Sequence, residues 1–594
     1  MIRAVWLIGL FASMSAWALV PGERIDDFRL MDHQGMSHHL YYYDDASAIV
    51  VMVQANGCET VRSALPELKA LRDAYAARGV QFFLLNSSLQ DDRASIAREA
   101  QDLNIDLPVL VDDAQLIGES LGLTRTAEVL VIDPKSWTLA YRGAIDDRSS
   151  DGSGTATASN HYLQAALDGV LSGTAIQVTH TEPQGTPIDF PARAQQSQFA
   201  QISYSETIGP MLVEHCASCH RPGGIGPWAM TDYNMVRGFS LMMREVLRTQ
   251  RMPPWHADPS IGHFSNDRSL SRAQLQTLVH WIEAGAPRGE GPDPLLDYQY
   301  AYDEWGELGE PDLVIDIPPT DVPATGVVDY QYKYVTNPLD HDVWVRASQI
   351  VPGDRAVLHH VITRFGEMQV EGPRAGRLSR RGGGGLAGYV PGMIERELPD
   401  GTGTLLPAGA TIEFQMHYTT YGKPATDHSR LAIYFHDQPP QHEIHSMILL
   451  NPRIRIPANT KSHRESAERL FDHDVLVYSL LPHAHYRGKA SEFKAVYPDG
   501  REEVLLWVPN YDFNWQTTYV LEEPKLLPAG TKMVHTTWWD NSAQNPANPD
   551  PNRVVPWGQQ SWDEMLFGAV SYRELDASEL AELKAAGRAL ASSE

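Results

Sequence analysis

One short segment in the middle of the chain has the residue types and the spacing of a covalent haem site. Cys216, Cys219 and His220 form the pattern C-x-x-C-H. In this pattern the two thiols add to the vinyl groups of haem, and the histidine reaches the iron from the same turn. A zinc site or a disulfide pair is the alternative. The motif predicts haem c, with Cys216 and Cys219 as the covalent attachment and His220 as an axial iron ligand.

The second axial ligand of this iron is expected further along the chain. Met252 lies in the sequence Arg-Met-Pro-Pro-Trp, where the two prolines hold the backbone extended. A thioether raises the potential of a haem used for electron transfer, which favours Met252. Met230 competes with it, whereas Met242 and Met243 lie in a predicted helix and are expected in the core. His256 is a further alternative and would give a haem of lower potential.

Three groups of histidines follow in the second half of the chain. His359 and His360 are adjacent, His417 stands alone, and His483 and His485 are two residues apart. Alternate residues of a strand share a side, so the last pair has the geometry to chelate one metal ion. Adjacent residues of a regular strand face opposite ways, so His359 and His360 could share an ion only at a bulge or a strand end. The three groups together predict a metal site.

Several domains must bring these distant residues together. The chain has 594 residues, and a single apolar core stops growing at roughly 250 to 300 residues. Three or four domains are therefore expected. The formal net charge is -27 at pH 7. This charge argues against nucleic acid as a partner, because phosphate contacts need clustered Lys and Arg.

Residues 1–18 have the three regions of a secretory signal. Arg3 supplies the positive charge, residues 4–12 are apolar, and Ala16 and Ala18 are the small residues before cleavage. A membrane helix needs about 20 apolar residues, so an uncleaved anchor is the less favoured alternative. We expect a periplasmic or secreted protein with no membrane span after signal cleavage.

Residues 19–172 alternate apolar runs with helical patterns, as βαβ units do. Strands are predicted over 48–53 and 80–85, and a helix over 65–77. Cys58 follows the first strand and precedes the helix, so helix amides and Arg62 could stabilise a thiolate there. This position resembles the active cysteine of thioredoxin-like redoxins and peroxiredoxins. The resemblance implies an α/β thioredoxin-like domain.

Two departures weaken the catalytic side of this resemblance. Val61 stands where C-x-x-C would have its second cysteine, and Ala127 stands where thioredoxins carry a cis-proline. We therefore expect a redoxin fold kept as a docking or structural module, with a semi-buried Cys58. The alternative is a redox-active thiol at Cys58, in a thiol peroxidase or reductase.

Composition and periodicity divide the rest of the chain. Residues 204–290 resemble small cytochromes c, which implies an all-α domain with helices over 208–215 and 271–284. After them the pattern changes to short alternating strands, which predicts β-sandwiches. The predicted order is a linker at 173–203, the cytochrome c domain at 204–290, a linker at 291–311, sandwiches at 312–440 and 441–575, and a helical tail at 576–594.

The sandwich region resembles the copper type II, ascorbate-dependent monooxygenases, the family of peptidylglycine alpha-hydroxylating and dopamine beta-monooxygenases. It has the family's His-His, Met-His-Tyr, His-x-His and Glu-Met motifs in the same order. The resemblance implies two jelly-roll sandwiches with one copper ion on each. It implies an electron-transfer copper held by His359, His360 and His417. It also implies a catalytic, oxygen-binding copper held by His483, His485 and Met565.

The resemblance implies a copper-dependent monooxygenase that hydroxylates an activated C–H bond of a small-molecule substrate with O2. Haem c could deliver the electrons, drawn from an external donor such as an ascorbate-like reductant or a periplasmic redox protein. Leu481 stands where the peptide hydroxylases carry a substrate-binding arginine, so a peptide-amidating activity is not expected. Two alternatives stay open: an electron-transfer or copper-handling protein without hydroxylase activity, and a thiol peroxidase centred on Cys58.

Overall fold

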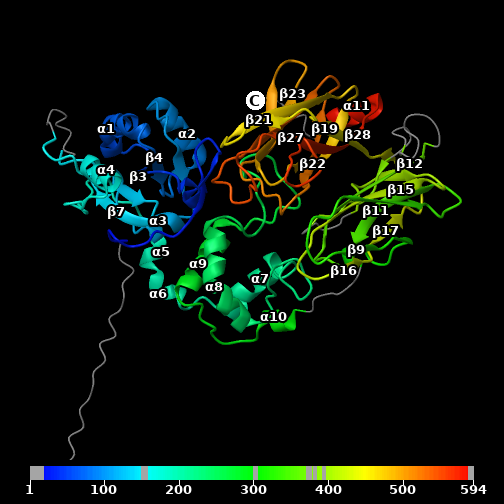
Figure 1. Ribbon diagram of the computed structural model, residues 1–594, viewed down its shortest axis with the longest axis horizontal. Helices are drawn as coiled ribbons and strands as arrows, with labels where there is room; N and C mark the ends of the chain where they lie inside the picture. The colour runs from blue at the N-terminus through cyan, green and yellow to red at the C-terminus, as the bar shows by residue number, and fades with distance from the viewer. Residues whose placement is uncertain are drawn as a thin grey trace, which may run out of the picture. The chain divides into compact units, whose positions relative to one another are not determined.

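The computed structural model describes residues 19–148, 158–298, 305–369, 378, 384–390 and 397–585 (Figure 1). The predicted signal at 1–18 and the end of the tail, 586–594, lie outside these residues. Contacts divide the chain into two compact units. The first runs through Gly209 and adds Val236–Pro253 and Leu270–Pro292, and the second contains Pro210–Met235, Pro254–Ser269 and the chain from Asp293 onward. Within the described ranges, no helix has the length and apolar character needed to cross a membrane.

A five-stranded mixed sheet, in the order β5-β4-β3-β6-β7, is the centre of the first unit. Its strands are β3 (Ala48–Gln54), β4 (Val80–Asn86), β5 (Val109–Val111), β6 (Val129–Asp133) and β7 (Thr138–Gly143). The helices around it are α1 (Glu59–Ala76), α2 (Arg93–Asp102), α3 (Leu116–Ser120) and α4 (Tyr162–Ser172), and β1 (Arg29–Met31), β2 (Ser37–His39) and η1 (Leu40–Tyr43) precede it. Alternate residues of β3 face two separate apolar cores. The predicted βαβ pattern is confirmed.

A buried ion pair fastens β7 to the start of β6. The Arg142 guanidinium lies 2.5 Å from Glu128 Oε1, and both side chains are under 5% exposed. Arg142 also donates to the carbonyl oxygens of Leu19, Leu121 and Gly122. Removing one partner of such a pair leaves an uncompensated buried charge.

We expect Glu128→Gln to lower the free energy of unfolding of this unit by about 3 to 5 kcal/mol, because Arg142 stays buried without its counter-ion. Urea unfolding followed by far-UV circular dichroism measures the change. The exposed pair of Arg272 and Asp113 provides the control, since Asp113→Asn should change stability by less than about 1 kcal/mol. Equal effects of the two substitutions would contradict the prediction.

The segment predicted as a linker, 173–203, packs closely on the redoxin sheet. It contains α5 (Pro191–Ala194) and α6 (Gln196–Phe199). Phe190 enters the core beside β3, and Arg193 donates to carbonyl oxygens at the end of α3. Phe199 stacks on His280 with ring centroids 4.1 Å apart. The polar residues of this segment, from which a linker was predicted, form hydrogen bonds with the redoxin domain.

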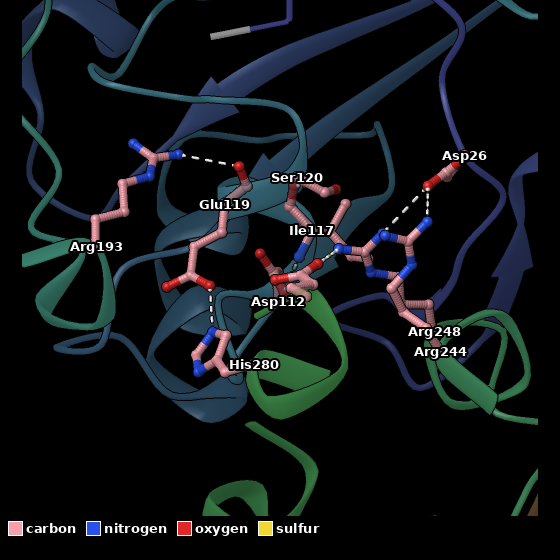
Figure 2. Close-up of polar contacts among 10 residues, drawn as sticks. Asp26, Asp112, Ile117, Glu119, Ser120, Arg193, Arg244, Arg248 and His280 are labelled. Atoms are coloured by element: carbon pink, nitrogen blue, oxygen red, sulfur yellow. Dashed lines mark hydrogen bonds and ion pairs between the residues drawn. The ribbon is translucent and has the colours of Figure 1, made fainter. Parts of the chain in front are cut away.

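The predicted cytochrome segment contains η2 (Tyr204–Ile208), α7 (Gly209–His215), α8 (Tyr233–Arg248) and α9 (Arg272–Glu283), followed by α10 (Pro294–Asp297) and η3 (Gly306–Leu308). The predicted helices near 208–215 and 271–284 are thus present. Most of α8, and α9, belong to the first unit. Figure 2 shows Arg244 and Arg248 at Asp26, and His280 Nε2 lies 2.7 Å from Glu119 Oε2. Helices α8 and α9 thus contact residues of the redoxin domain. An independent cytochrome c domain stays a prediction.

Two β-sandwiches form most of the second unit. The first combines the sheets β10-β15-β12-β13 and β18-β14-β11-β17-β8 with the pair β16-β9. Its strands are β8 (Leu313–Asp316), β9 (Thr320–Val322), β10 (Gln331–Thr336), β11 (Val343–Val351), β12 (Leu358–Gly366), β13 (Gly384–Gly385), β14 (Thr402–Leu406), β15 (Thr411–Tyr418), β16 (Ala425–Asp427), β17 (Arg430–Phe435) and β18 (His442–Glu443). The pairing of β18 with β14 extends this sandwich past the predicted boundary at 440.

The second sandwich combines the four-stranded sheets β19-β28-β22-β25 and β21-β26-β23-β24 with the pair β20-β27. Its strands are β19 (His445–Leu450), β20 (Arg455–Ile456), β21 (His463–Leu470), β22 (Val475–His483), β23 (Gly488–Val496), β24 (Glu502–Val508), β25 (Tyr519–Leu527), β26 (Lys532–Trp539), β27 (Val555–Pro556) and β28 (Phe567–Glu574). The predicted all-β region is confirmed. Helix α11 (Ala577–Ala585) has a partner that the sequence did not indicate, because Leu580 packs with Leu476.

The segment Pro254–Ser269 adds to the second sandwich. Phe264 forms an antiparallel bridge with Leu521 of β25, and Asp258 N donates to Trp507 O at 2.9 Å. Trp255 packs edge-on against Tyr519, with ring centroids 4.9 Å apart. This part of the predicted cytochrome segment therefore packs on the core of the second sandwich.

Candidate functional site

The first histidine cluster forms on two paired strands, β12 and β15. His360 pairs with His417 across the strands, and the register shifts between Leu358 and His360. His359 is therefore the extra residue of a β-bulge, which confirms the predicted condition for two adjacent histidines to act together. Alternation holds in β15, where Met416 faces the core at 0% exposure. His417 points to the other face, and it is buried as well.

The three imidazoles of this cluster can hold one metal ion. Each offers a ring nitrogen, and these nitrogens lie within 4.8 Å of one another. Tyr330 stacks on His417, with centroids 4.6 Å apart and planes 2° from parallel. This ring fixes the orientation of His417 and shields one of its faces from water.

Burial keeps these imidazoles neutral. It lowers the pKa of His359 to about 3 and, together with the neighbouring histidines, lowers the pKa of His360 well below its usual value. Burial lowers the pKa of His417 to about 4. Neutral imidazole is the form that ligates metals. His417 Nδ1 is buried and has no hydrogen-bond partner among the described residues, which fits a metal ligand better than a core histidine.

The second cluster lies where β22 ends. The rings of His483 and His485 are 5.2 Å apart between centroids. Burial lowers the pKa of His483 to about 4 and that of His485 well below its usual value. His483 Nδ1 lies 2.7 Å from Gln516 Oε1, so it carries the proton and leaves Nε2 available. The buried Nδ1 of His485 has no partner within the described part of the chain.

A buried carboxylate connects His485 to the segment that carries Met565. Glu564 accepts hydrogen bonds from the backbone N–H groups of His485 at 2.8 Å and Arg487 at 2.6 Å. Phe567 pairs with His483 across β28 and β22. Met565 is half-buried and lies two residues before Phe567, as His485 lies two residues after His483. Met565 as a ligand stays a prediction.

A loop after β24 contains site residues that sequence reasoning did not assign to the site. Tyr511 and Phe513 are as buried as core residues, since each is 8% exposed. However, Tyr511 hydrogen-bonds the backbone of the second cluster, and Phe513 stacks on His359 with centroids 4.9 Å apart. Gln516 and Tyr330 were not singled out. Asp512, a turn-forming residue between the aromatics, could have marked this stretch as a loop.

The C-x-x-C-H segment forms a turn after α7. Its thiols, Cys216 and Cys219, are free, which rules out a disulfide between them in this structure. His220 N donates to Cys216 O at 3.0 Å. His220 Nδ1 lies 3.0 Å from Trp228 O, so Nδ1 carries the proton and Nε2 is the atom available to iron.

The candidate sixth ligands have different surroundings. Met252 is half-buried and belongs to the first unit, whereas His220 belongs to the second, so its role stays a prediction. Met230 is buried, and its N–H donates to His220 O at 2.8 Å. Met243 is buried as expected, but Met242 is 50% exposed and does not belong to the core.

Cys58 is the residue that precedes α1, and it lies beneath the segment predicted as a linker. Its Sγ is 3.0 Å from Thr126 Oγ1 and 3.7 Å from Thr186 Oγ1. Burial raises the pKa of the thiol, but hydrogen bonds from Thr126, the Val61 N–H and Thr186 outweigh it, and the net shift is downward. The expected role of Arg62 is not seen, because Arg62 extends to Glu59 on the helix surface.

We expect Thr126→Val to raise the pKa of Cys58, because the thiolate loses a hydrogen bond, and a hydrogen bond to a charged group contributes about 1.5 to 3 kcal/mol. Less thiolate is then present at neutral pH, and alkylation by iodoacetamide slows. The pH profile of the alkylation rate measures the shift. Thr174→Val, on the exposed turn after α4, is the control. An unchanged profile would contradict the assignment of Thr126 as a donor.

Known proteins match the N-terminal part of the chain. Residues 21–147 match the family model described as the AhpC/TSA family. Among solved structures, a hypothetical protein from Sinorhizobium meliloti 1021 is 24% identical, with a TM-score of 0.27 over 30% of this chain and 97% of that chain. An uncharacterized conserved protein from Geobacillus kaustophilus is 25% identical, with a TM-score of 0.27 over 29% of this chain and 92% of that chain. Peroxidoxin BcpB from Mycobacterium tuberculosis is 17% identical, with a TM-score of 0.21 over 26% of this chain and 97% of that chain.

The comparison with curated proteins gives no match. The family match agrees with the sheet and helices described for residues 19–172. The chain is thus a multidomain protein with an N-terminal α/β thioredoxin-like domain of the redoxin type and a C-terminal all-β region. The redoxin fold indicates oxidoreductase chemistry.

Proposed function

We propose that this chain is an exported, copper-dependent monooxygenase that hydroxylates an activated C–H bond of a small molecule with O2. The observation that carries the proposal is the gathering of His359, His360 and His417. Their ring nitrogens come within 4.8 Å of one another on a bulged strand pair. The second pair, His483 and His485, extends the argument to a second metal position.

The donor sets fit copper. Imidazole binds both oxidation states of copper, and a thioether favours Cu(I), the state that meets O2. Among the described residues the buried Nδ1 atoms of His417 and His485 have no hydrogen-bond partner, and a metal ion would supply one. When bound, copper would supply one-electron redox chemistry at the first cluster and oxygen activation at the second.

The chain's own residues orient the proposed ligands. Gln516 sets the tautomer of His483 by accepting from Nδ1. Glu564 holds the backbone of His485, and its own neighbour is Met565. Tyr330 covers the face of His417 and keeps water from it. These contacts hold the proposed ligands before any ion arrives, so binding requires little reorganisation.

Haem c at Cys216 and Cys219 would supply the electrons one at a time. The free thiols and the protonated Nδ1 of His220 fit that group. Met252 remains the proposed sixth ligand. We propose a small-molecule reductant of the ascorbate type or a periplasmic redox protein as the external donor.

Metal and product analysis of the full-length protein tests the proposal. We expect copper at both clusters, iron as haem c, and oxygen-18 from labelled O2 in a hydroxylated product. Copper and haem cycling without substrate-dependent oxygen uptake would instead indicate an electron-transfer or copper-handling protein. A copper-free protein with full activity would end the proposal.

A thiol-disulfide or peroxidase function is the second candidate. It is favoured by the AhpC/TSA match and by the short contact of Cys58 with Thr126, which lowers the thiol pKa. A partner thiol would have to come from another molecule, because the remaining cysteines are those of the C-x-x-C-H motif. Peroxide or disulfide reduction that disappears in Cys58→Ser would establish this function.

A further inference from the structure

The loop after β24 connects the two histidine clusters. Tyr511 OH donates to Ala484 O at 2.9 Å and accepts from Ala484 N at 3.1 Å, which ties the loop to the residue between His483 and His485. Gln516 Oε1 accepts from His483 at the other end of the loop. The loop is therefore fastened at both ends to the second cluster.

Phe513 reaches from this loop to the first cluster. Its ring stacks on His359, with centroids 4.9 Å apart and planes 17° from parallel. The same ring meets His485 edge-on, with centroids 6.0 Å apart and planes at 87°. Phe513 is 8% exposed. A single phenyl ring thus contacts one imidazole from each sandwich.

One amide side chain, that of Gln516, connects Phe513 to His483 of the second cluster. Gln516 Nε2 donates to Phe513 O at 3.2 Å, while Gln516 Oε1 accepts from His483. Tyr486 packs edge-on against the phenyl ring, with centroids 4.9 Å apart. The position of Phe513 is consequently linked to the position of His483, because displacing either residue strains or breaks a hydrogen bond of Gln516.

We propose that Phe513 is the positioning residue that couples the two clusters, by holding His359 and His485 on either side of one dry aromatic contact. This inference rests on the proposed copper function. One electron would pass along this contact, so that copper at the first cluster goes from Cu(I) to Cu(II) and copper at the second goes from Cu(II) to Cu(I). The electron comes originally from the one-electron donor, haem c, and no bond or proton changes at the phenyl ring.

The ring also determines what separates the clusters. An apolar side chain that contacts both imidazoles leaves no room for water between those two rings. A simple core role for Phe513 would require only its volume. The coupling role requires a ring in this plane, so leucine and tyrosine at this position should behave differently.

Three variants of the full-length protein separate these roles. Phe513→Leu removes the ring, Phe513→Tyr retains it, and Phe471→Leu is a matched loss of a buried ring in the same sandwich, away from both clusters. The first readout needs no metal: in metal-free protein with carbon-13-labelled histidine, the His359 Hε1 resonance, assigned by its loss in His359→Gln, reports the ring current of the stacked phenyl group.

The second readout follows the electron. Copper-loaded, fully oxidised protein receives one electron by pulse radiolysis without oxygen, and freeze-quench electron paramagnetic resonance follows the redistribution between the two Cu(II) signals. We expect Phe513→Leu to slow this step by about 10- to 100-fold, as a misplaced contact does. Phe513→Tyr and Phe471→Leu should keep the wild-type rate.

The outcomes distinguish the two proposals. Wild-type protein that does not bind copper at both clusters defeats the proposed function, while the metal-free resonance still tests the Phe513 contact. Copper at both clusters with the same transfer rate in Phe513→Leu overturns the coupling role. A His359 resonance that stays at its wild-type position in Phe513→Leu also overturns it. If the leucine variant holds less copper, Phe513→Met replaces it in the transfer measurement, with the same expected loss.

Discussion

The His417→Ala variant is expected to lose copper from the first cluster and to lower substrate-dependent oxygen uptake at least about 100-fold, because even outer partners of metal ligands change activity by 10- to 100-fold. His417 contributes a buried nitrogen that has no partner in the described part of the chain, and it lies opposite His360 in the paired strands. Copper at the second cluster should remain. Metal analysis and an oxygen electrode measure the two effects.

The control for this substitution is His341→Ala. His341 lies in the same sandwich, but its side chain is 69% exposed and pairs with Asp340 at the surface. Full copper content and normal uptake are expected. Since His417→Ala also leaves a cavity beneath Tyr330, thermal unfolding of the metal-free variants separates lost stability from lost ligation. Normal copper content in His417→Ala would remove this histidine from the site.

The Met565→Leu variant is expected to abolish substrate-dependent oxygen uptake while haem reduction continues. Leucine keeps the volume and apolar character of methionine but has no sulfur to favour Cu(I). A loss of at least about 100-fold is expected if the thioether is a ligand. Stopped-flow absorbance of the haem, together with oxygen uptake, measures both quantities in one preparation.

Cys58→Ser is the control for Met565→Leu, because the two variants together distinguish the copper proposal from the thiol proposal. In the copper proposal, oxygen uptake persists in Cys58→Ser and disappears in Met565→Leu. In the thiol proposal, Cys58→Ser abolishes peroxide or disulfide reduction and Met565→Leu leaves that reduction unchanged, because the Cys58 thiol is the reacting group. Full uptake in Met565→Leu would remove the thioether from the oxygen step, whatever Cys58→Ser does.

Local patterns predicted several elements correctly because each depends on neighbours in the chain. The apolar run over 48–53 became the buried strand β3, since consecutive β-forming residues suit a sheet covered on both faces. The adjacency of His359 and His360 predicted a bulge, because only an irregular strand allows neighbouring side chains to act together.

Other features depended on contacts between distant segments. The stretch 173–203 has the composition of a linker, yet Phe190 and Phe199 pack on elements far from it in the chain. Arg62 was expected beside Cys58 because of its sequence position, but the helix directs it toward Glu59 at the surface. Composition describes what a segment can do, and tertiary packing decides which partner it finds.

The sequence by itself determined the chemical types of the candidate groups: a thiol before a helix, a C-x-x-C-H turn, and three histidine groups with a following Glu-Met. Those types follow from residue identity and short spacing. Only the tertiary structure decided that Phe513 stands between His359 and His485 and that Gln516 joins His483 to the same loop. The contact of Phe513 with His359 joins segments more than a hundred residues apart, and close packing, rather than local pattern, selects it.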